Sequence, residues 1–229
     1  MNDRIRHQLE AFLRVRELKT VYASRIPVTS LAATLLARND QTITQIEEAA
    51  AQGSSGTRAA QEATVSKSLA REELIEELMR MARTARGMRR TVPGIEEKFR
   101  SPGRLSDQEL LTLARATATD ALTFKEEFIK RGFPPDFLED FNEDRERFEE
   151  AMSRQTQGGS VQVSSTAAVE DLAAEGMETL RELDPIMRNL FEDDPAALAA
   201  WLTARRIERA PRRKKREDEE PPAPAQPNQ

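Results

Sequence analysis

The sequence predicts an all-α protein: an antiparallel up-and-down helical bundle of five to six helices with a disordered C-terminal tail. Apolar residues recur every three to four positions along most of the 229-residue chain, which is the period of helices that bury one face. Only 38% of the residues are hydrophobic, and narrow helical stripes use them better than a sheet of nearly continuous apolar strands. The 9 glycines and 12 prolines are too few for tight-turned all-β architectures.

The first helix is expected over residues 3–24, with Asn2 or Asp3 as its N-cap. Pro27 interrupts the pattern because proline has no N–H group and clashes with the preceding turn. A second helix is expected to begin at residue 29 or 30 and to end at residues 53–56, whose sequence Gly-Ser-Ser-Gly indicates a flexible loop.

A third helix is predicted over residues 57–90, with Thr57 at its cap. Its apolar positions from Leu74 to Met88 alternate steps of four and three residues, a 3.5-residue repeat suited to close antiparallel packing. Because the loop at 53–56 is short, the second and third helices are expected to be antiparallel neighbours.

Two further helices are predicted around a phenylalanine-rich hairpin. Ser106 and Glu109 have the spacing of a capping box, and Gly132 ends the fourth helix. Residues 134–135, both proline, begin the fifth. Six of the nine phenylalanines fall between residues 124 and 148, and core packing is favoured over an aromatic ligand pocket. The side chains expected to be buried between these helices are Phe124, Phe128, Phe141 and Phe148.

Residues 157–165 are polar and contain two glycines, so a loop is expected there. In the sixth helix that follows, Pro185 either kinks the helix or occupies the first position of a new helix capped by Asp184. Asp194 precedes another proline and predicts a last helix to about residue 209. That helix is expected to pack through Leu198, Trp201 and Leu202.

The bundle is expected over residues 1–209, and a disordered charged and proline-rich tail over residues 210–229. From residue 205 to 216 the chain has eight basic residues against Glu208, a net charge of +7, before four consecutive acidic residues. The favoured interpretation is a solvated tail whose first arginines complement the dipole of the last helix. The alternative is binding to phosphates of nucleic acid or anionic lipid. The candidate anion-binding residues are Arg212, Arg213, Lys214, Lys215 and Arg216.

Composition excludes several classes of chemistry. The absence of cysteine excludes disulfides, thiolate zinc sites, iron–sulfur clusters and cysteine nucleophiles. His7 is the only histidine, which excludes multi-histidine metal sites, and an exposed first-turn histidine is favoured over a catalytic triad with Asp3. No phosphate loop, dinucleotide fingerprint, nucleophile elbow or calcium loop occurs. Carboxylate clusters alternate with basic residues, as on solvated helix faces. We therefore expect no enzymatic activity, no cofactor and no metal.

No segment reaches the roughly 18 apolar residues that a membrane span requires, and the N-terminus lacks the apolar core of a secretory signal. The expected location is therefore the cytoplasm.

Residues 201–213, from Trp201 to Arg213, resemble the C-terminal end of a group of uncharacterised bacterial all-helical proteins. The layout of Pro27, Ile46, the Gly-Ser segment and a long third helix is similar to theirs. The resemblance implies a helical fold and carries over no functional residue, because the group has no assigned activity.

The function expected from these patterns is that of a non-enzymatic structural or protein-interaction bundle, with protein partners or self-association. The alternative, not favoured, is a nucleic-acid-associated bundle that binds phosphates through the basic C-terminal segment. No pattern identifies a small-molecule ligand.

Overall fold

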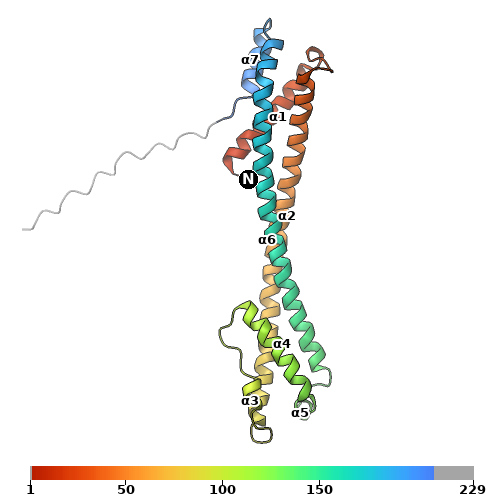
Figure 1. Cartoon of the computed structure of the whole chain (residues 1–229), viewed down its shortest axis with the longest axis vertical. Coiled ribbons are helices and arrows are strands. Elements are labelled where there is room, and N and C mark those ends of the chain that lie inside the picture. Colours follow the sequence, from red (N-terminus) through yellow and green to blue (C-terminus); the bar gives the residue numbers. More distant parts are fainter. Residues whose placement is uncertain (1, 209–229) are drawn as a thin grey trace, which may run out of the picture. The chain divides into compact units, whose positions relative to one another are not determined.

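The computed structural model describes residues 2–208, and their regular structure is entirely helical, which confirms the all-α class (Figure 1). The expected tail, residues 210–229, lies outside the described residues. The chain divides into two compact units. Within the described residues, unit 1 combines residues 2–45 with residues 170–208, and unit 2 comprises residues 46–169. No helix within residues 2–208 is both long enough and apolar enough to cross a membrane.

Unit 1 contains α1 (Asp3–Val21), the short 3-10 helix η1 (Ala23–Arg25) and α7 (Pro195–Ala204), with the first part of α2 (Leu31–Met88) and the last part of α6 (Phe137–Leu190). Helix α1 packs against α7. The largest fully buried side chains of this unit are Phe12, Leu36, Ile43, Phe191 and Trp201.

The ends of the unit 1 helices follow local signals. The Asn2 side chain accepts a 2.9 Å hydrogen bond from the Ile5 N–H group, which confirms the predicted cap of α1. Ser30 caps α2 by accepting a 3.2 Å bond from the N–H group of Ala33. The Asp194 carboxylate accepts from the first N–H groups of α7, as predicted. Helix α7 ends at Ala204 rather than near residue 209.

Unit 2 contains α3 (Ile95–Lys98), α4 (Asp107–Thr123) and α5 (Lys125–Ile129), packed on the later part of α2 and the earlier part of α6. The capping box of Ser106 and Glu109 is present. The predicted fourth helix is divided at Phe124 into α4 and α5, and Gly132 lies beyond α5 with a φ of 91°. Proline residues 134–135 precede the first turn of α6.

The phenylalanines form the core of unit 2. Phe128, Phe141 and Phe148 are fully buried as predicted, whereas Phe124 is half-buried at the edge of the cluster. Phe128 packs edge to face on the rings of Phe99 and Phe133.

The structure corrects the prediction of loops at residues 53–56 and 157–165. Both segments lie inside uninterrupted helices, α2 and α6, so the predicted second and third helices are one helix rather than antiparallel neighbours. The hydroxyl of Ser54 donates to the carbonyl of Ala50, and that of Thr57 donates to Gly53, so these polar side chains are satisfied within the helix. Thr57 is therefore not a helix cap.

Pro185 lies within α6, so Asp184 does not cap a separate helix. The carboxylate of Asp184 instead accepts hydrogen bonds from Trp201 and Arg188. Of the three residues expected to pack the last helix, Trp201 is fully buried, Leu198 is half-buried and Leu202 is exposed.

Candidate interaction surface

The sequence-predicted candidate site lies outside the described residues: nothing in the structure places Arg212, Arg213, Lys214, Lys215 or Arg216. His7 is half-buried on α1, with Nδ1 3.1 Å from a carboxylate oxygen of Glu10. Within residues 2–208, no three histidine or carboxylate side chains are grouped so that they could hold a metal ion.

The feature of unit 2 that sequence reasoning missed is a seam of very small residues between α2 and α6. Buried positions of α2 recur there every seven residues, and the facing positions of α6 have the same spacing, as in an antiparallel coiled coil. We define the small-residue seam as Gly53, Gly56, Ala60 and Ala63 of α2 with Gly158 and Ser165 of α6.

The backbones of the two helices approach closely at the seam. A Cβ atom at Gly158 would lie 2.7 Å from the backbone nitrogen of Ala60, and one at Gly56 would lie 2.9 Å from the carbonyl oxygen of Gly158. A Cβ atom at Gly53 would lie 3.2 Å from that of Ser165. The glycines therefore serve helix packing, because a larger residue would force the two backbones apart.

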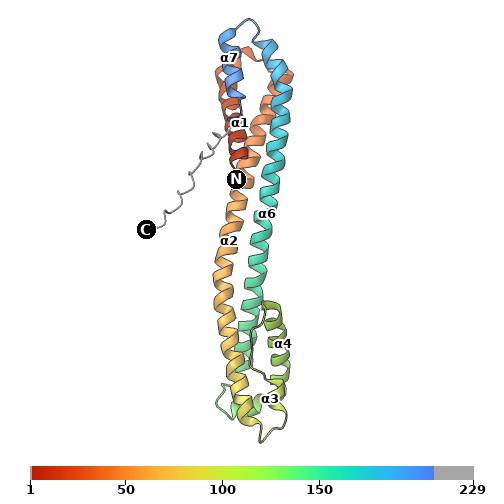
Figure 2. The same cartoon turned by 90° about the vertical axis from the view of Figure 1, so that its left-hand side faces the viewer.

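The seam contributes little apolar burial of its own. An alanine methyl group contributes on the order of 0.8 kcal/mol when buried, whereas a leucine side chain contributes about 1.5–3 kcal/mol. A side-chain hydrogen bond of 2.8 Å from Gln155 to Thr64 also links the helices. Figure 2 shows α2 and α6 side by side along this stretch, with no other helix of the described part of unit 2 beside it.

The same stretch is nearly free of charge, although 33% of the whole chain is charged. On α6, the fifteen residues 155–169 contain no acidic or basic side chain. On α2, Arg58 is the one charged residue between Glu48 and Glu62. A helix pair that only water surrounds usually has charged residues on its outer face, so this composition favours a packed surface.

An open groove of about 670 Å³ lies along the seam. Glu62 and Arg154 are its charged lining residues, and the remainder of the lining is small or uncharged. Exposed apolar side chains occur on the same stretch of both helices: Val65, Leu69, Val161 and Val163. The groove, the missing charge and the exposed apolar residues together indicate an interaction surface.

A sequence signal for this surface exists. Ala49, Gly56, Ala63 and Ala70 are spaced by seven residues and share one face of α2. The Gly-Ser-Ser-Gly run hides that signal, because the same residues are typical of a turn.

Comparisons of the chain with protein-family models, with curated proteins and with solved structures find no match. The resemblance of residues 201–213 to bacterial all-helical proteins therefore receives no support from them.

Proposed function

We propose that this chain is a non-enzymatic structural protein that self-associates, with the groove along the small-residue seam of one copy packing on the same groove of a second copy. The observation that carries the proposal is the groove on α2 and α6, whose lining is uncharged except for Glu62 and Arg154. We also propose the cytoplasm as its compartment, which a cysteine-free chain permits.

The choice of a second copy rests on charge. In a two-fold symmetric dimer the same surface patch contributes from both subunits, so charges near the axis face identical charges. The chain has a net charge of −5, and acidic helix faces would repel each other in such a contact. The stretch around residues 155–169 avoids this repulsion, and it offers no charge by which a charged foreign partner would be selected.

Packing supports the same choice. Small residues let helices approach closely, and the exposed Val161, which lines the groove, supplies apolar area that the isolated chain leaves in water. In a dimer, α2 and α6 of both copies would form a four-helix bundle around the groove and bury this apolar area. The two helices of a single copy cannot bury it.

The test is the molar mass of the full chain by light scattering over a concentration series, with a matched pair of variants. Ala59 and Ala51 are both exposed alanines of α2, but only Ala59 lines the groove. We expect a dimer for the wild type and for Ala51→Arg, and a monomer of unchanged helicity for Ala59→Arg. A wild-type chain that stays monomeric at about 100 μM, a concentration well above a micromolar dissociation constant, would overturn the proposal.

A further inference from the structure

A second surface of unit 2, separate from the small-residue seam, is strongly basic. Every arginine between residues 83 and 104 is exposed and forms no ion pair with another residue of the described chain. Most other arginines within residues 2–208 do form one. We call the five of them that lie at the end of α2, in the turn after it and beside α3 the arginine patch: Arg83, Arg86, Arg89, Arg90 and Arg100.

The end of α2 places several of these side chains together. Arg83 and Arg86 are three residues apart on α2, so they are neighbours on one helix face with an axial step of about 4.5 Å. Arg90 lies in the turn that directly follows the end of α2. Arg100 joins them because it lines a small pocket of about 260 Å³ together with Arg86. The side chain of Arg86 also lies 3.4 Å from the hydroxyl of Ser101.

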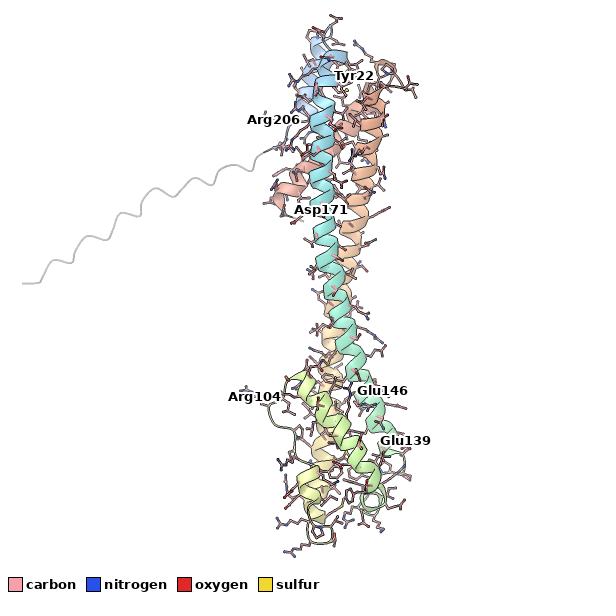
Figure 3. The ribbon with its side chains drawn as sticks, viewed as in Figure 1. Tyr22, Arg104, Glu139, Glu146, Asp171 and Arg206 are labelled. Carbon is pink, nitrogen blue, oxygen red and sulfur yellow. The ribbon has the colours of Figure 1, made fainter. Side chains whose placement is uncertain are left out.

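The positive charge of the patch is not neutralised locally. Glu96 and Glu97 are the only acidic residues between positions 83 and 104. Arg104 is not part of the patch, because in Figure 3 it lies near the beginning of α4, away from the end of α2, and the adjacent Leu105 accepts a hydrogen bond from Arg71. Holding so many guanidinium groups near one another costs free energy through mutual repulsion, and a polyanion would offset that cost.

We propose that the arginine patch binds the phosphate backbone of nucleic acid. A guanidinium group donates two parallel hydrogen bonds to phosphate oxygens, and the patch consists of arginine alone. The aromatic residue within it, Phe99, is buried and cannot stack on bases. Binding therefore occurs through the backbone, without a preference for sequence.

A lipid surface fits the patch less well. Of the large apolar residues between these arginines, Met88, Ile95 and Phe99 are buried in the core of unit 2, and Val92 is half-buried against it. They are not available to insert between lipid chains, as an amphipathic membrane helix requires.

The experiment titrates the full chain against a fluorescent duplex DNA of about 20 base pairs, by anisotropy at several salt concentrations. If about four phosphates are neutralised, the log–log slope of affinity against salt is near −4. The variant Arg83→Gln/Arg86→Gln/Arg90→Gln should weaken binding at least tenfold at low salt and make the slope shallower by about 2 to 3.

The matched control removes the same charge elsewhere. Arg4, Arg16 and Arg38 are also exposed and form no ion pair within the described chain, and they belong to unit 1. The variant Arg4→Gln/Arg16→Gln/Arg38→Gln should bind as the wild type does. Equal losses in the two triple variants would mean that only net charge matters, and would overturn the proposal.

A second comparison separates the patch from the basic segment 212–216. Neutralising those five residues to glutamine should leave most of the binding and most of the salt slope in place. If that change abolishes binding while the patch variant retains it, the patch is not the site. Failure of the wild type to bind duplex DNA at about 50 mM salt, or binding to phosphatidylserine vesicles alone, would also overturn the assignment.

Discussion

The indole Nε1 of Trp201 donates a 3.0 Å hydrogen bond to Oδ1 of Asp184, and this bond joins α7 to α6. Trp201 is fully buried. The same carboxylate also accepts a 3.0 Å bond from Arg188 and pairs with Arg205 at the end of α7. Burial alone would raise the pKa of Asp184, but the bonds from Trp201, Arg205 and Arg188 outweigh it and hold the pKa below its usual value.

Replacing Asp184 should destabilise unit 1. Asp184→Ala leaves the buried N–H group of Trp201 without an acceptor, which costs about 1–3 kcal/mol in the free energy of unfolding. Urea unfolding followed by the fluorescence of Trp201, the one tryptophan of the chain, reports this unit directly. Asp171 is an exposed aspartate of α6, and Asp171→Ala should change stability by less than about 0.5 kcal/mol. Equal effects at the two sites would contradict the role of the bond.

The stability that Asp184 contributes should depend on pH. Because its pKa is lower in the folded protein than in the unfolded chain, the contribution is complete above the unfolded pKa and is lost as pH falls through the folded pKa. Stability measured from about pH 5 downward should therefore fall more steeply in the wild type than in Asp184→Asn. Parallel curves for the two proteins would rule out a lowered pKa.

Asp144 should show the opposite behaviour. Burial raises its pKa, opposed by Arg147 and assisted by Glu73 and Asp140. A raised pKa means that ionisation costs more free energy in the folded state, so Asp144→Asn should stabilise the protein at neutral pH. The gain should decline as pH falls through the folded pKa and vanish below the unfolded pKa, where the wild-type carboxyl is protonated in both states. Thermal unfolding at neutral and acidic pH measures this gain in stability. A melting temperature for Asp144→Asn below that of the wild type at neutral pH would refute the prediction.

Alanine substitutions at two adjacent glycines of α6 should change the free energy of unfolding in opposite directions. A methyl group at Gly158 would lie 2.7 Å from the backbone nitrogen of Ala60, so Gly158→Ala forces α2 and α6 apart and should cost about 1–3 kcal/mol. Gly159 has no atom within 4 Å of the corresponding position, so Gly159→Ala should stabilise the helix by roughly 0.5–1 kcal/mol. Urea unfolding followed by far-UV circular dichroism compares the two. The same sign for both would show that the helices do not approach closely here.

Truncating Phe141 should be among the most damaging changes in unit 2. The side chain is 1% exposed in the phenylalanine core, and Phe141→Ala should cost about 3–5 kcal/mol through lost burial and a cavity. Leu122 on α4 is 69% exposed, so Leu122→Ala should cost less than about 0.5 kcal/mol by the same chemical denaturation. A loss below about 1 kcal/mol for Phe141→Ala, well under the usual cost of such a cavity, would mean that this ring is not packed.

Local sequence signals were sufficient to predict those helix ends at which a side chain bonds to a residue close to it in the sequence. Asn2, Ser106 and Asp194 cap helices as predicted, because the carboxylate, amide or hydroxyl oxygen reaches an N–H group two or three residues away. The phenylalanine core was also predictable, since large apolar residues at helical spacing have few alternatives to burial.

The two loops were mispredicted because a glycine has two physical uses. In an isolated segment it favours a turn, whereas between packed helices it lets two backbones touch. Only the contact of Gly56 with Gly158, about a hundred residues apart in sequence, decides which use applies. The seven-residue spacing of small residues on α2 is a signal for the seam, but without that contact the Gly-Ser-Ser-Gly run favours a turn.

The arginine patch was likewise predictable from the sequence only in part. The sequence by itself determined the helical class, most of the helix caps, the phenylalanine core and the run of arginines from Arg83 to Arg100. Only the tertiary structure decided that those arginines have no carboxylate partner within residues 2–208, and that Gly53–Gly56 continues a helix. The physical reason is range: caps and stripes depend on neighbours within about one or two turns, whereas ion pairing and helix approach depend on residues that folding brings together from distant parts of the chain.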